Sequence, residues 1–451
     1  MRLLLLAASC AAIAAAAGAN ETATFNKDVL PVLQKNCQSC HRPGEVAPMS
    51  LLTYQEARPW AKAIKAAVLS KKMPPWFADS KYGHFDNERR LTDAEVKTLT
   101  AWADNGAPEG NSKDKPAPIA WTEGWNIKPD VVIEMPNAFE VPASGIIEYQ
   151  YIVVPTHFDH DVWISAAEVR PGNRAVMHHV IVYVRPPGSS YLAEAQPGIP
   201  YVPVKFERDA NGAAIRRIPQ GDELKRAQSF ASSQASVELL TAFAPGLQEQ
   251  HFDSPIADAA KFVPAGSDLV FQLHYTTNGK PASDKTRIGL AFAKTMPKYR
   301  YLVSNAATQN FVIPPNDSNY ETHSTVTFNS EAKLVWLMPH MHVRGKDFLY
   351  QAVYPTGETE TLLNVPKYDF NWQLGYEEEK PLVMPKGSRI DCTAHFDNSP
   401  NNPANPNPNV SVRWGDQTWE EMMIGWFAVV VDASVKPSDV ILRQRPRGAA
   451  L

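Results

Sequence analysis

Between residues 25 and 109, apolar residues recur with the period of an α-helix. The pattern predicts three helices: a short one capped by Asn26, a second over residues 54–70, and a third that begins after Thr92. The third has the strongest start signal, because Thr92 and Glu95 have the spacing of a capping box. The apolar positions expected to face inward are Val29, Val32 and Leu33, then Trp60, Ile64 and Val68, then Val96, Leu99 and Trp102.

From residue 131 to residue 433 the pattern changes to short runs that alternate in polarity or are rich in β-branched residues. Connections rich in proline and asparagine separate these runs, and 38 prolines overall favour many loops over long helices. Antiparallel β-sandwiches are the architecture that such runs predict. The clearest predicted strands are residues 149–154, 161–169, 176–184, 269–275, 288–293, 325–328, 334–341 and 423–431.

A chain of 451 residues is too long for one ordinary core, so a multidomain protein is expected. The shift from helical to strand patterning, across a polar stretch with prolines, marks the main boundary. We divide the chain into a signal peptide (1–19), a small all-α domain (20–110), a linker (111–128) and two all-β domains (129–290 and 291–445).

The first residues resemble a secretory signal, with Arg2, an apolar run over residues 3–17, and small residues suited to cleavage. The run is shorter than the roughly 20 residues that span a bilayer, so a soluble periplasmic or secreted protein is expected. Cys10 lies in a degenerate lipoprotein site, which the very short apolar stretch before it disfavours. The net charge of −4 makes nucleic acid an unexpected partner.

Residues 37–41 read Cys-Gln-Ser-Cys-His, the signature by which haem is linked covalently to a polypeptide. With 4 Cys and 12 His in the chain, such a run arises by chance with a probability of roughly one in a thousand. The alternative is a chance pair of structural or zinc cysteines. We therefore predict a small cytochrome c domain in which Cys37 and Cys40 attach one c-type haem and His41 ligates its iron.

A second axial ligand is expected from Met73, which precedes the rigid pair Pro74 and Pro75 and lies 32 residues after His41. Met49 is the alternative, although it lies only eight residues past His41 and is expected on the same side of the haem. A thioether opposite histidine raises the reduction potential and leaves no open position. Electron transfer, and not oxygen binding, is therefore predicted for this haem.

The β region contains histidines whose strand parity suggests metal ligation. His340 and His342 alternate with the apolar face expected from Val335, Leu337, Met341 and Val343, so they should point together from the opposite face. His274 likewise lies opposite the packed face of its strand. His178 and His179 are adjacent, so their joint ligation requires a bulge or a strand end. The alternative for each is a hydrogen-bonded core histidine.

Imidazoles combined with the thioether of Met422 form a nitrogen and sulfur set that suits copper, especially Cu(I), better than zinc or iron. No carboxylate pair, Ser-His-Asp order, phosphate loop or dinucleotide fingerprint competes with this set in the sequence. Copper together with a haem domain indicates electron chemistry.

Four segments of the β region resemble the type II copper, ascorbate-dependent monooxygenases, whose eukaryotic members include peptidylglycine α-hydroxylating monooxygenase and dopamine β-monooxygenase. They occur in the family's order, and the resemblance covers residues 129–433. Bacterial members of that family have segments that resemble the N-terminal haem segment and residues 395–399 and 414–416 of this chain. The four segments are Met177–Val180, Leu273–Tyr275, Pro339–Lys346 and Glu420–Met422.

The resemblance implies two jelly-roll-like antiparallel sandwiches, each holding one copper. It implies that His178, His179 and His274 hold the electron-transfer copper. It assigns the oxygen-activating, catalytic copper to His340, His342 and Met422. The eukaryotic enzymes are disulfide-rich, whereas this β region contains only Cys392, and the residues that bind their substrates have no match here.

The implied reaction is hydroxylation of a substrate C–H bond, in which O2, two electrons and two protons give one hydroxyl group and one water. The expected partners are O2, an unknown small-molecule or peptide substrate, and a periplasmic donor or ascorbate-like reductant. We predict that the cytochrome domain feeds electrons to the coppers. The alternative is an electron-transfer or copper-binding module without oxygenase activity, in which the sandwiches are a scaffold.

Three further residues have candidate roles near the predicted copper site. His395 follows a strand-like run and is a candidate to support a copper ligand from behind. Arg344 and Lys346 follow the copper histidines and are candidates to meet an anionic substrate, with solvation at the surface as the default.

Overall fold

The computed structural model describes residues 22–442, with gaps at residues 46, 122–123 and 248 and at several positions between 204 and 236. The predicted signal peptide and Cys10 lie outside the described residues. The chain forms two compact units. Unit 1 comprises Met1–Pro74 and Leu91–Ile119, and unit 2 comprises Pro75–Arg90 and Ala120–Leu451.

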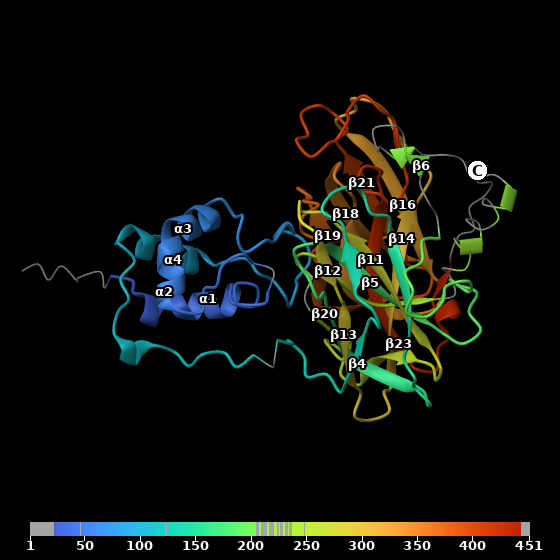
Figure 1. Ribbon diagram of the computed structural model, residues 1–451, viewed down its shortest axis with the longest axis horizontal. Helices are drawn as coiled ribbons and strands as arrows, with labels where there is room; N and C mark the ends of the chain where they lie inside the picture. Colours follow the sequence, from blue (N-terminus) through green and yellow to red (C-terminus); the bar gives the residue numbers. More distant parts are fainter. Residues whose placement is uncertain are drawn as a thin grey trace, which may run out of the picture. The chain divides into compact units, whose positions relative to one another are not determined.

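Unit 1 is helical, as the periodicity predicted (Figure 1). The capping box at Thr92 is confirmed, since its hydroxyl accepts from Glu95 N and the Glu95 carboxylate accepts from Thr92 N. The helices are η1 (Phe25–Val29), α1 (Leu30–Asn36), α2 (Tyr54–Ala57), η2 (Arg58–Trp60), α3 (Ala61–Leu69), α4 (Asp93–Asp104) and η3 (Ser112–Asp114).

Two details of the helix predictions are wrong. Trp60 was expected to face inward but is 42% exposed, because the 3-10 turn η2 at Pro59 interrupts the α-helical period between α2 and α3. Asn26 is not a cap. It lies buried inside η1, and its side-chain amide donates to the carbonyl oxygen of Asn111 instead.

Unit 2 is built from several antiparallel sheets, and all eight strands predicted from the sequence are present. The largest is nine-stranded, with the order β1-β13-β4-β10-β14-β23-β17-β20 and β9 paired with β4. Its strands are β1 (Val131–Glu134), β4 (Val162–Arg170), β9 (Gln250–His251), β10 (Ala259–Val263), β13 (Arg287–Phe292), β14 (Tyr299–Thr308), β17 (Ala332–His340), β20 (Tyr376–Met384) and β23 (Met423–Asp432).

Two smaller sheets supply the facing layers. The four-stranded sheet has the order β3-β11-β5-β8, and the five-stranded sheet has the order β19-β18-β21-β16-β24. The strands of the first are β3 (Gln150–Pro155), β5 (Met177–Arg185), β8 (Glu238–Phe243) and β11 (Asp268–Tyr275); those of the second are β16 (Tyr320–Phe328), β18 (Gly345–Val353), β19 (Thr359–Val365), β21 (Arg389–Phe396) and β24 (Ile441–Leu442). Short pairs add β2 (Phe139–Val141) with β12 (Ala282–Asp284), β6 (Glu207–Arg208) with β7 (Ala214–Ile215), and β15 (Val312–Ile313) with β22 (Val412–Arg413); η5 spans Pro437–Asp439.

The two halves of unit 2 share the nine-stranded sheet, in which a two-residue parallel pairing of β10 with β14 joins the strands of one half to those of the other. A boundary at residue 290 therefore falls inside β13, which is hydrogen-bonded along its length to β4. The connection between the halves is instead the short segment 293–298 between β13 and β14.

Apolar side chains cover both faces of the shared sheet. Leu334 and Leu337 on β17, and Met341 just after it, pack in the C-terminal core, whereas Val335 on β17 packs in the N-terminal core. The prediction that Val335 and Leu337 share a face is therefore wrong. A register shift between Leu334 and Trp336 inserts one residue and reverses the parity of the strand before that point.

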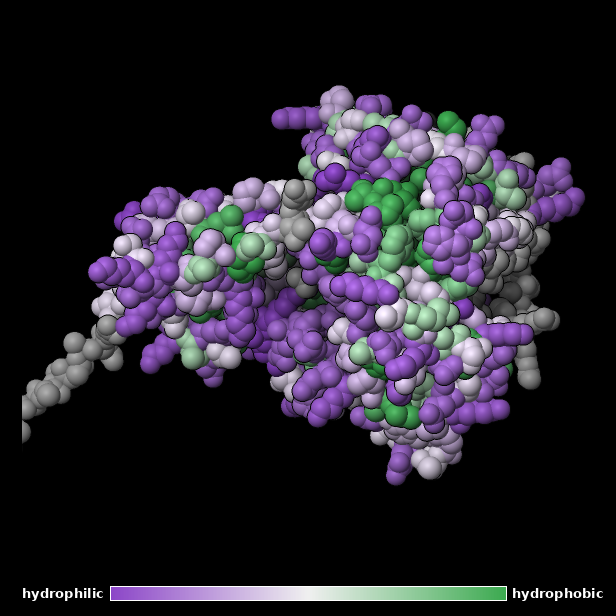
Figure 2. Space-filling model, turned by 90° about the horizontal axis from the view of Figure 1, so that it is seen from below, coloured by the Kyte–Doolittle hydropathy of each residue, from purple (hydrophilic) through white to green (hydrophobic). Residues whose placement is uncertain are grey.

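One face of the molecule is shown in Figure 2, where hydrophilic side chains predominate and apolar ones form several patches. Exposed apolar residues include Leu69, Met296 and Val410. Within the described part of the chain, no helix is long and apolar enough to cross a membrane.

Candidate metal centres

The structure brings His178, His179 and His274 together, and we call them the N-terminal histidine group. His179 lies opposite His274 in the pairing of β5 with β11, and the register then shifts so that Met177 pairs with Tyr275. His178 is thus the extra residue of a bulge. Adjacent strand residues normally point to opposite faces, so a bulge of this kind was needed for His178 and His179 to point to the same side. His274 lies on the strand face opposite Phe271 and Leu273, as predicted.

The donor atoms of this group converge. One ring nitrogen from each histidine lies within 4.8 Å of the others. The Nδ1 atoms of His178 and His179 are 3.0 Å apart. The Nδ1 atom of His274 is buried without a hydrogen-bond partner among the described residues. A buried imidazole nitrogen without a partner is costly, unless a ligand that the group is built to hold satisfies it.

Burial keeps these imidazoles neutral. Desolvation, with the neighbouring histidines, lowers the pKa of His178 to about 4 and that of His274 to about 3. The pKa of His179 is also lowered, mainly by burial. Neutral imidazole is the form that ligates a metal, so all three rings are ready to bind one at neutral pH.

The lowered pKa values predict that the metal-free protein loses stability as pH falls below 6.5. In the unfolded chain, His274 becomes protonated near pH 6.5, whereas in the folded protein it stays neutral down to about pH 3. The free energy of unfolding should therefore fall by about 1.4 kcal/mol per pH unit for His274 alone. Urea unfolding at a series of pH values measures this slope. His274→Asn should make the slope shallower, whereas His160→Asn, at an exposed position, should not.

His340 and His342 form the C-terminal histidine group. His340 ends β17 and His342 follows in the turn, with ring centroids 5.3 Å apart and planes perpendicular. The Nδ1 atom of His340 is 3.0 Å from Gln373 Oε1, and that of His342 is 3.1 Å from the carbonyl oxygen of Glu420. Acceptors at both Nδ1 atoms make Nε2 the nitrogen that each ring can offer to a metal.

Met422 is flanked in the sequence by residues that contact this group. The carbonyl oxygen of Glu420 contacts His342, and Ile424 pairs with His340 across β17 and β23. The buried carboxylate of Glu421 accepts hydrogen bonds from the backbone N–H groups of His342, at 2.9 Å, and Arg344, at 2.7 Å. Burial raises the pKa of Glu421 to about 8, while these donors, the Arg344 guanidinium and the N–H of Met422 favour its charged form.

One aromatic ring connects the two histidine groups. Phe370 stacks on His178 with centroids 4.8 Å apart, and its ring centroid is 6.0 Å from that of His342. Phe370 belongs to the site loop, residues 366–375 between β19 and β20, which also carries Gln373. The two groups therefore contact the same loop, which the sequence did not reveal.

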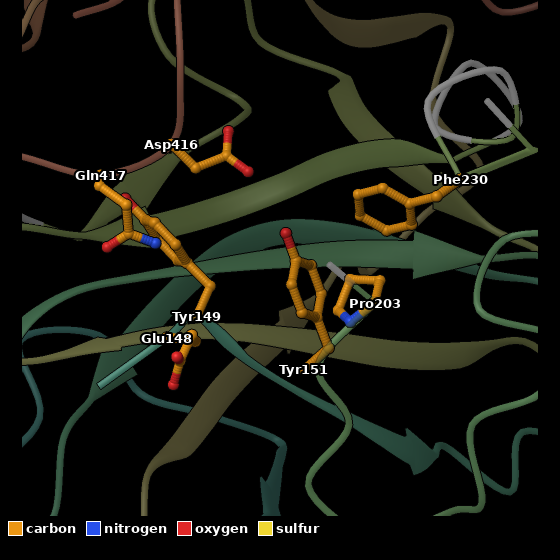
Figure 3. Close-up of a pocket in the computed structure, with 7 residues that line it drawn as sticks. All are labelled: Glu148, Tyr149, Tyr151, Pro203, Phe230, Asp416 and Gln417. Atoms are coloured by element: carbon orange, nitrogen blue, oxygen red, sulfur yellow. The ribbon is translucent and has the colours of Figure 1, made fainter. Parts of the chain in front are cut away.

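A small hollow is lined in part by Tyr149, Tyr151 and Asp416 (Figure 3). Tyr149 connects this hollow with the N-terminal histidine group, because its ring stacks on that of His274 with centroids 4.7 Å apart. Gln417 is 2% exposed, and its Oε1 atom has no hydrogen-bond partner among the described residues. The hollow thus combines aromatic walls with polar and acidic groups; its lining is Glu148, Tyr149, Tyr151, Pro203, Phe230, Asp416 and Gln417.

In unit 1, Cys37 and Cys40 are free, and the Nδ1 atom of His41 is 3.2 Å from the carbonyl oxygen of Met49. This contact holds the imidazole by Nδ1 and leaves Nε2 as its ligand atom. It also places the backbone of Met49 next to the Nδ1 edge of the ring. Burial lowers the pKa of His41, which favours the neutral, ligating form.

The candidate roles of Arg344, Lys346 and His395 change in the structure. Arg344 is 1% exposed and bonds to Asn398 Oδ1 at 2.8 Å, so it is a buried structural cation and not a solvated or substrate-facing one. Lys346 donates to the carbonyl oxygen of Ser318. The ring nitrogens of His395 contact the carboxylates of Asp347 and Glu321 within the five-stranded sheet, so they do not support a copper ligand.

Comparison with known proteins leaves the function open. No family model and no curated protein matches the chain. A structure of the infectious bursal disease virus Gx strain matches at 10% identity and a TM-score of 0.17, covering 70% of this chain and 77% of that one. The VP2 subviral particle of the same virus matches at 10% identity and a TM-score of 0.18, covering 68% and 73%. Similarity at these scores does not establish a shared fold.

Proposed function

We propose that this chain is an exported, two-copper monooxygenase of the type II class, with a fused cytochrome c domain and two jelly-roll-like sandwiches. The reaction hydroxylates a substrate C–H bond and consumes O2, two electrons and two protons, with water as the second product. The observation that carries the proposal is the convergence of three imidazoles in the N-terminal histidine group, where His274 Nδ1 is buried with no hydrogen-bond partner among the described residues.

The donor sets fit copper. Three neutral imidazoles in one group, and the imidazoles of His340 and His342 with the thioether of Met422 in the other, are nitrogen and sulfur sets of the kind that copper prefers. When bound, copper would supply the one-electron chemistry that O2 activation needs. Gln373 and Glu420 fix the rings of His340 and His342 through Nδ1, so that Nε2 faces the metal.

The residues around the groups shape where a substrate can approach. Phe370 and Tyr149 pack against the histidine rings and restrict water on those sides. The hollow that Tyr149 shares with Asp416 and Gln417 provides polar groups next to the N-terminal histidine group. We assign this hollow to the substrate side of the site.

The haem fits Cys37, Cys40 and His41. Both thiols are free, and the imidazole is held by Nδ1 with Nε2 as its ligand atom. When bound, haem would supply one electron at a time from a periplasmic donor. The carbonyl oxygen of Met49 contacts His41 Nδ1, which favours Met73 over Met49 as the residue that would supply the second haem ligand.

Met73→Ala is expected to remove the axial thioether and lower the haem reduction potential, because thioether ligation raises it. The sulfur-to-iron charge-transfer band of the ferric protein should disappear in this variant. Met49→Ala is the matched control and should keep both the band and the potential. Loss of the band in Met49→Ala alone would reverse the assignment.

Oxygenase activity is tested by incubating the copper-loaded protein with metabolite extracts under 18O2 and searching for products that gain one oxygen atom. The wild type should yield a labelled product, and His342→Ala should yield none. An electron-transfer or copper-binding module would bind metal and show no labelled product in either protein. That outcome, with copper bound, would favour the module over the monooxygenase.

Delivery of electrons by the cytochrome is tested separately by stopped-flow reduction of the copper centres. We expect His41→Ala and Met73→Ala to slow copper reduction by a periplasmic cytochrome donor. Reduction at the wild-type rate in both variants would contradict this role and would point to an ascorbate-like reductant.

A further inference from the structure

A segment between two parts of the cytochrome unit belongs structurally to the β unit. The chain leaves unit 1 after Pro74, forms Pro75–Arg90 as part of unit 2, and returns to unit 1 at Leu91. We call Pro75–Arg90 the clasp. Met73, the candidate haem ligand, lies two residues before the first residue of the clasp, so the haem domain continues covalently into it.

The clasp is seated by aromatic packing. The rings of Trp76 and Phe85 lie 4.9 Å and 5.3 Å from that of Tyr376, the first residue of β20. Gly83 has φ +70°, and a Cβ there would meet the Phe85 ring and the carbonyl oxygen of Leu362 on β19. Only glycine fits this close approach without strain.

Hydrogen bonds tie the clasp to both ends of the site loop. At the β19 end, Asp79 N donates to the carbonyl oxygen of Asn364 at 2.8 Å. At the β20 end, Asn87 Nδ2 donates to the carbonyl oxygen of Gly375 at 3.0 Å, and Asn87 Oδ1 accepts from Glu377 N at 3.1 Å. Because β19 and β20 are each at the edge of a sheet, the clasp forms hydrogen bonds with backbone groups that have no neighbouring strand on that side.

Between these anchors, the site loop reaches both histidine groups. Gln373 Oε1 lies 3.0 Å from His340 Nδ1, and Phe370 stacks on His178. Gln373 N also donates to the carbonyl oxygen of Pro245 in the other half of the unit. The loop has no regular secondary structure of its own, so its conformation depends on its held ends together with contacts along it, such as Tyr368 N with the carbonyl oxygen of Lys346.

We propose that the clasp positions the copper ligands through the site loop, with Asn87 as the positioning residue at the β20 end. This inference rests on the proposed function for its consequence, the orientation of His340. Asn87 holds Gly375 and Glu377 by hydrogen bonds at the β20 end of the site loop. The loop then carries Gln373, whose side chain contacts the His340 ring. A change in the clasp, where the cytochrome unit joins the β unit, is thereby transmitted to a metal-ligand side chain.

The test compares Asn87→Ala with Asn278→Ala, a control whose side chain makes a local turn contact to Lys280 N. Hydrogen–deuterium exchange of the metal-free proteins is read in peptides that cover the site loop. Gln373 N donates to Pro245 and not to Asn87, so its protection reports transmission along the loop. We expect about tenfold faster exchange of the site loop in Asn87→Ala, a modest local opening, and none in the control.

Cu(I) titration against a chromogenic chelator gives the second readout. Asn87→Ala and Gln373→Ala should each weaken one copper site by about tenfold, the size of effect typical when a ligand's supporting partner is removed. The double variant should be no weaker than Gln373→Ala alone, because both changes act through the same contact. Additive losses would mean that Asn87 acts by another route.

Unchanged loop exchange in Asn87→Ala would overturn the inference. If Asn87→Ala does not fold, Asn87→Ser, which keeps a small polar side chain, is measured in the same way. The exchange readout needs no metal, so it separates the two proposals. A wild-type protein that binds no copper would contradict the proposed function, while faster loop exchange in Asn87→Ala would still support the clasp.

Discussion

Phe85→Ala is expected to lower the free energy of unfolding of the β unit by about 3–5 kcal/mol, the cost typical of deleting a buried phenylalanine. Phe85 is 8% exposed and packs in the C-terminal core with Trp76 and Tyr376. The effect should appear in the β unit, although residue 85 lies between two parts of the helical unit in the sequence. Urea unfolding followed by far-ultraviolet circular dichroism measures it.

Tyr82→Ala is the matched control, because Tyr82 is an aromatic residue of the same clasp but is 39% exposed. Its loss should change the free energy of unfolding by no more than about 0.5 kcal/mol, as is usual for surface positions. Equal effects of the two substitutions, or destabilisation of only the helical unit by Phe85→Ala, would contradict the clasp's place in the β core.

Glu421→Ala is expected to destabilise the β unit by about 3–5 kcal/mol, because it removes a buried carboxyl group that accepts two backbone N–H groups and lies beside the buried Arg344 guanidinium. Glu421 is fully buried, and its Oε1 atom is 3.9 Å from Arg344 Nη1. The change also leaves the backbone N–H groups of His342 and Arg344 without their acceptor. We therefore expect weaker copper binding at His342 in addition to the lower unfolding midpoint.

Glu321→Ala is the control for this change. Glu321 also contacts charged partners, His323 and His395, but its side chain is 53% exposed. Exposed pairs of this kind contribute about 0–1 kcal/mol, so its unfolding curve should nearly overlay that of the wild type. A loss for Glu421→Ala no larger than that for Glu321→Ala would show that Glu421 does not organise the metal centre.

The strands were predictable because their signal is local. Periodicity of two, with β-branched residues, located β5, β11, β17 and β23, which carry or flank the candidate ligands. Parity failed only where a register shift intervened, as at Val335 on β17. The predicted domain boundary at residue 290 falls inside β13, because a sheet shared by the two halves leaves no break in the strand pattern of the sequence.

The candidate ligands were predictable, but the residues that hold them were not. Histidines and methionine are rare enough to be noticed, and the bulge that His178 and His179 required is present. Gln373 and Phe370 are ordinary residues in an irregular loop, and their contacts join positions far apart in the sequence. The clasp was assigned to the cytochrome domain because its partners on β19 and β20 follow almost 300 residues later.

Anaerobic Cu(I) titration of the haem-loaded wild type, His274→Ala and His342→Ala is the most direct test of two copper centres, one in each histidine group. We expect two Cu(I) per chain for the wild type and one for each variant, with both variants folded by circular dichroism. A wild type that binds one copper or none, or variants that each still bind two, would contradict the presence of one copper centre in each histidine group.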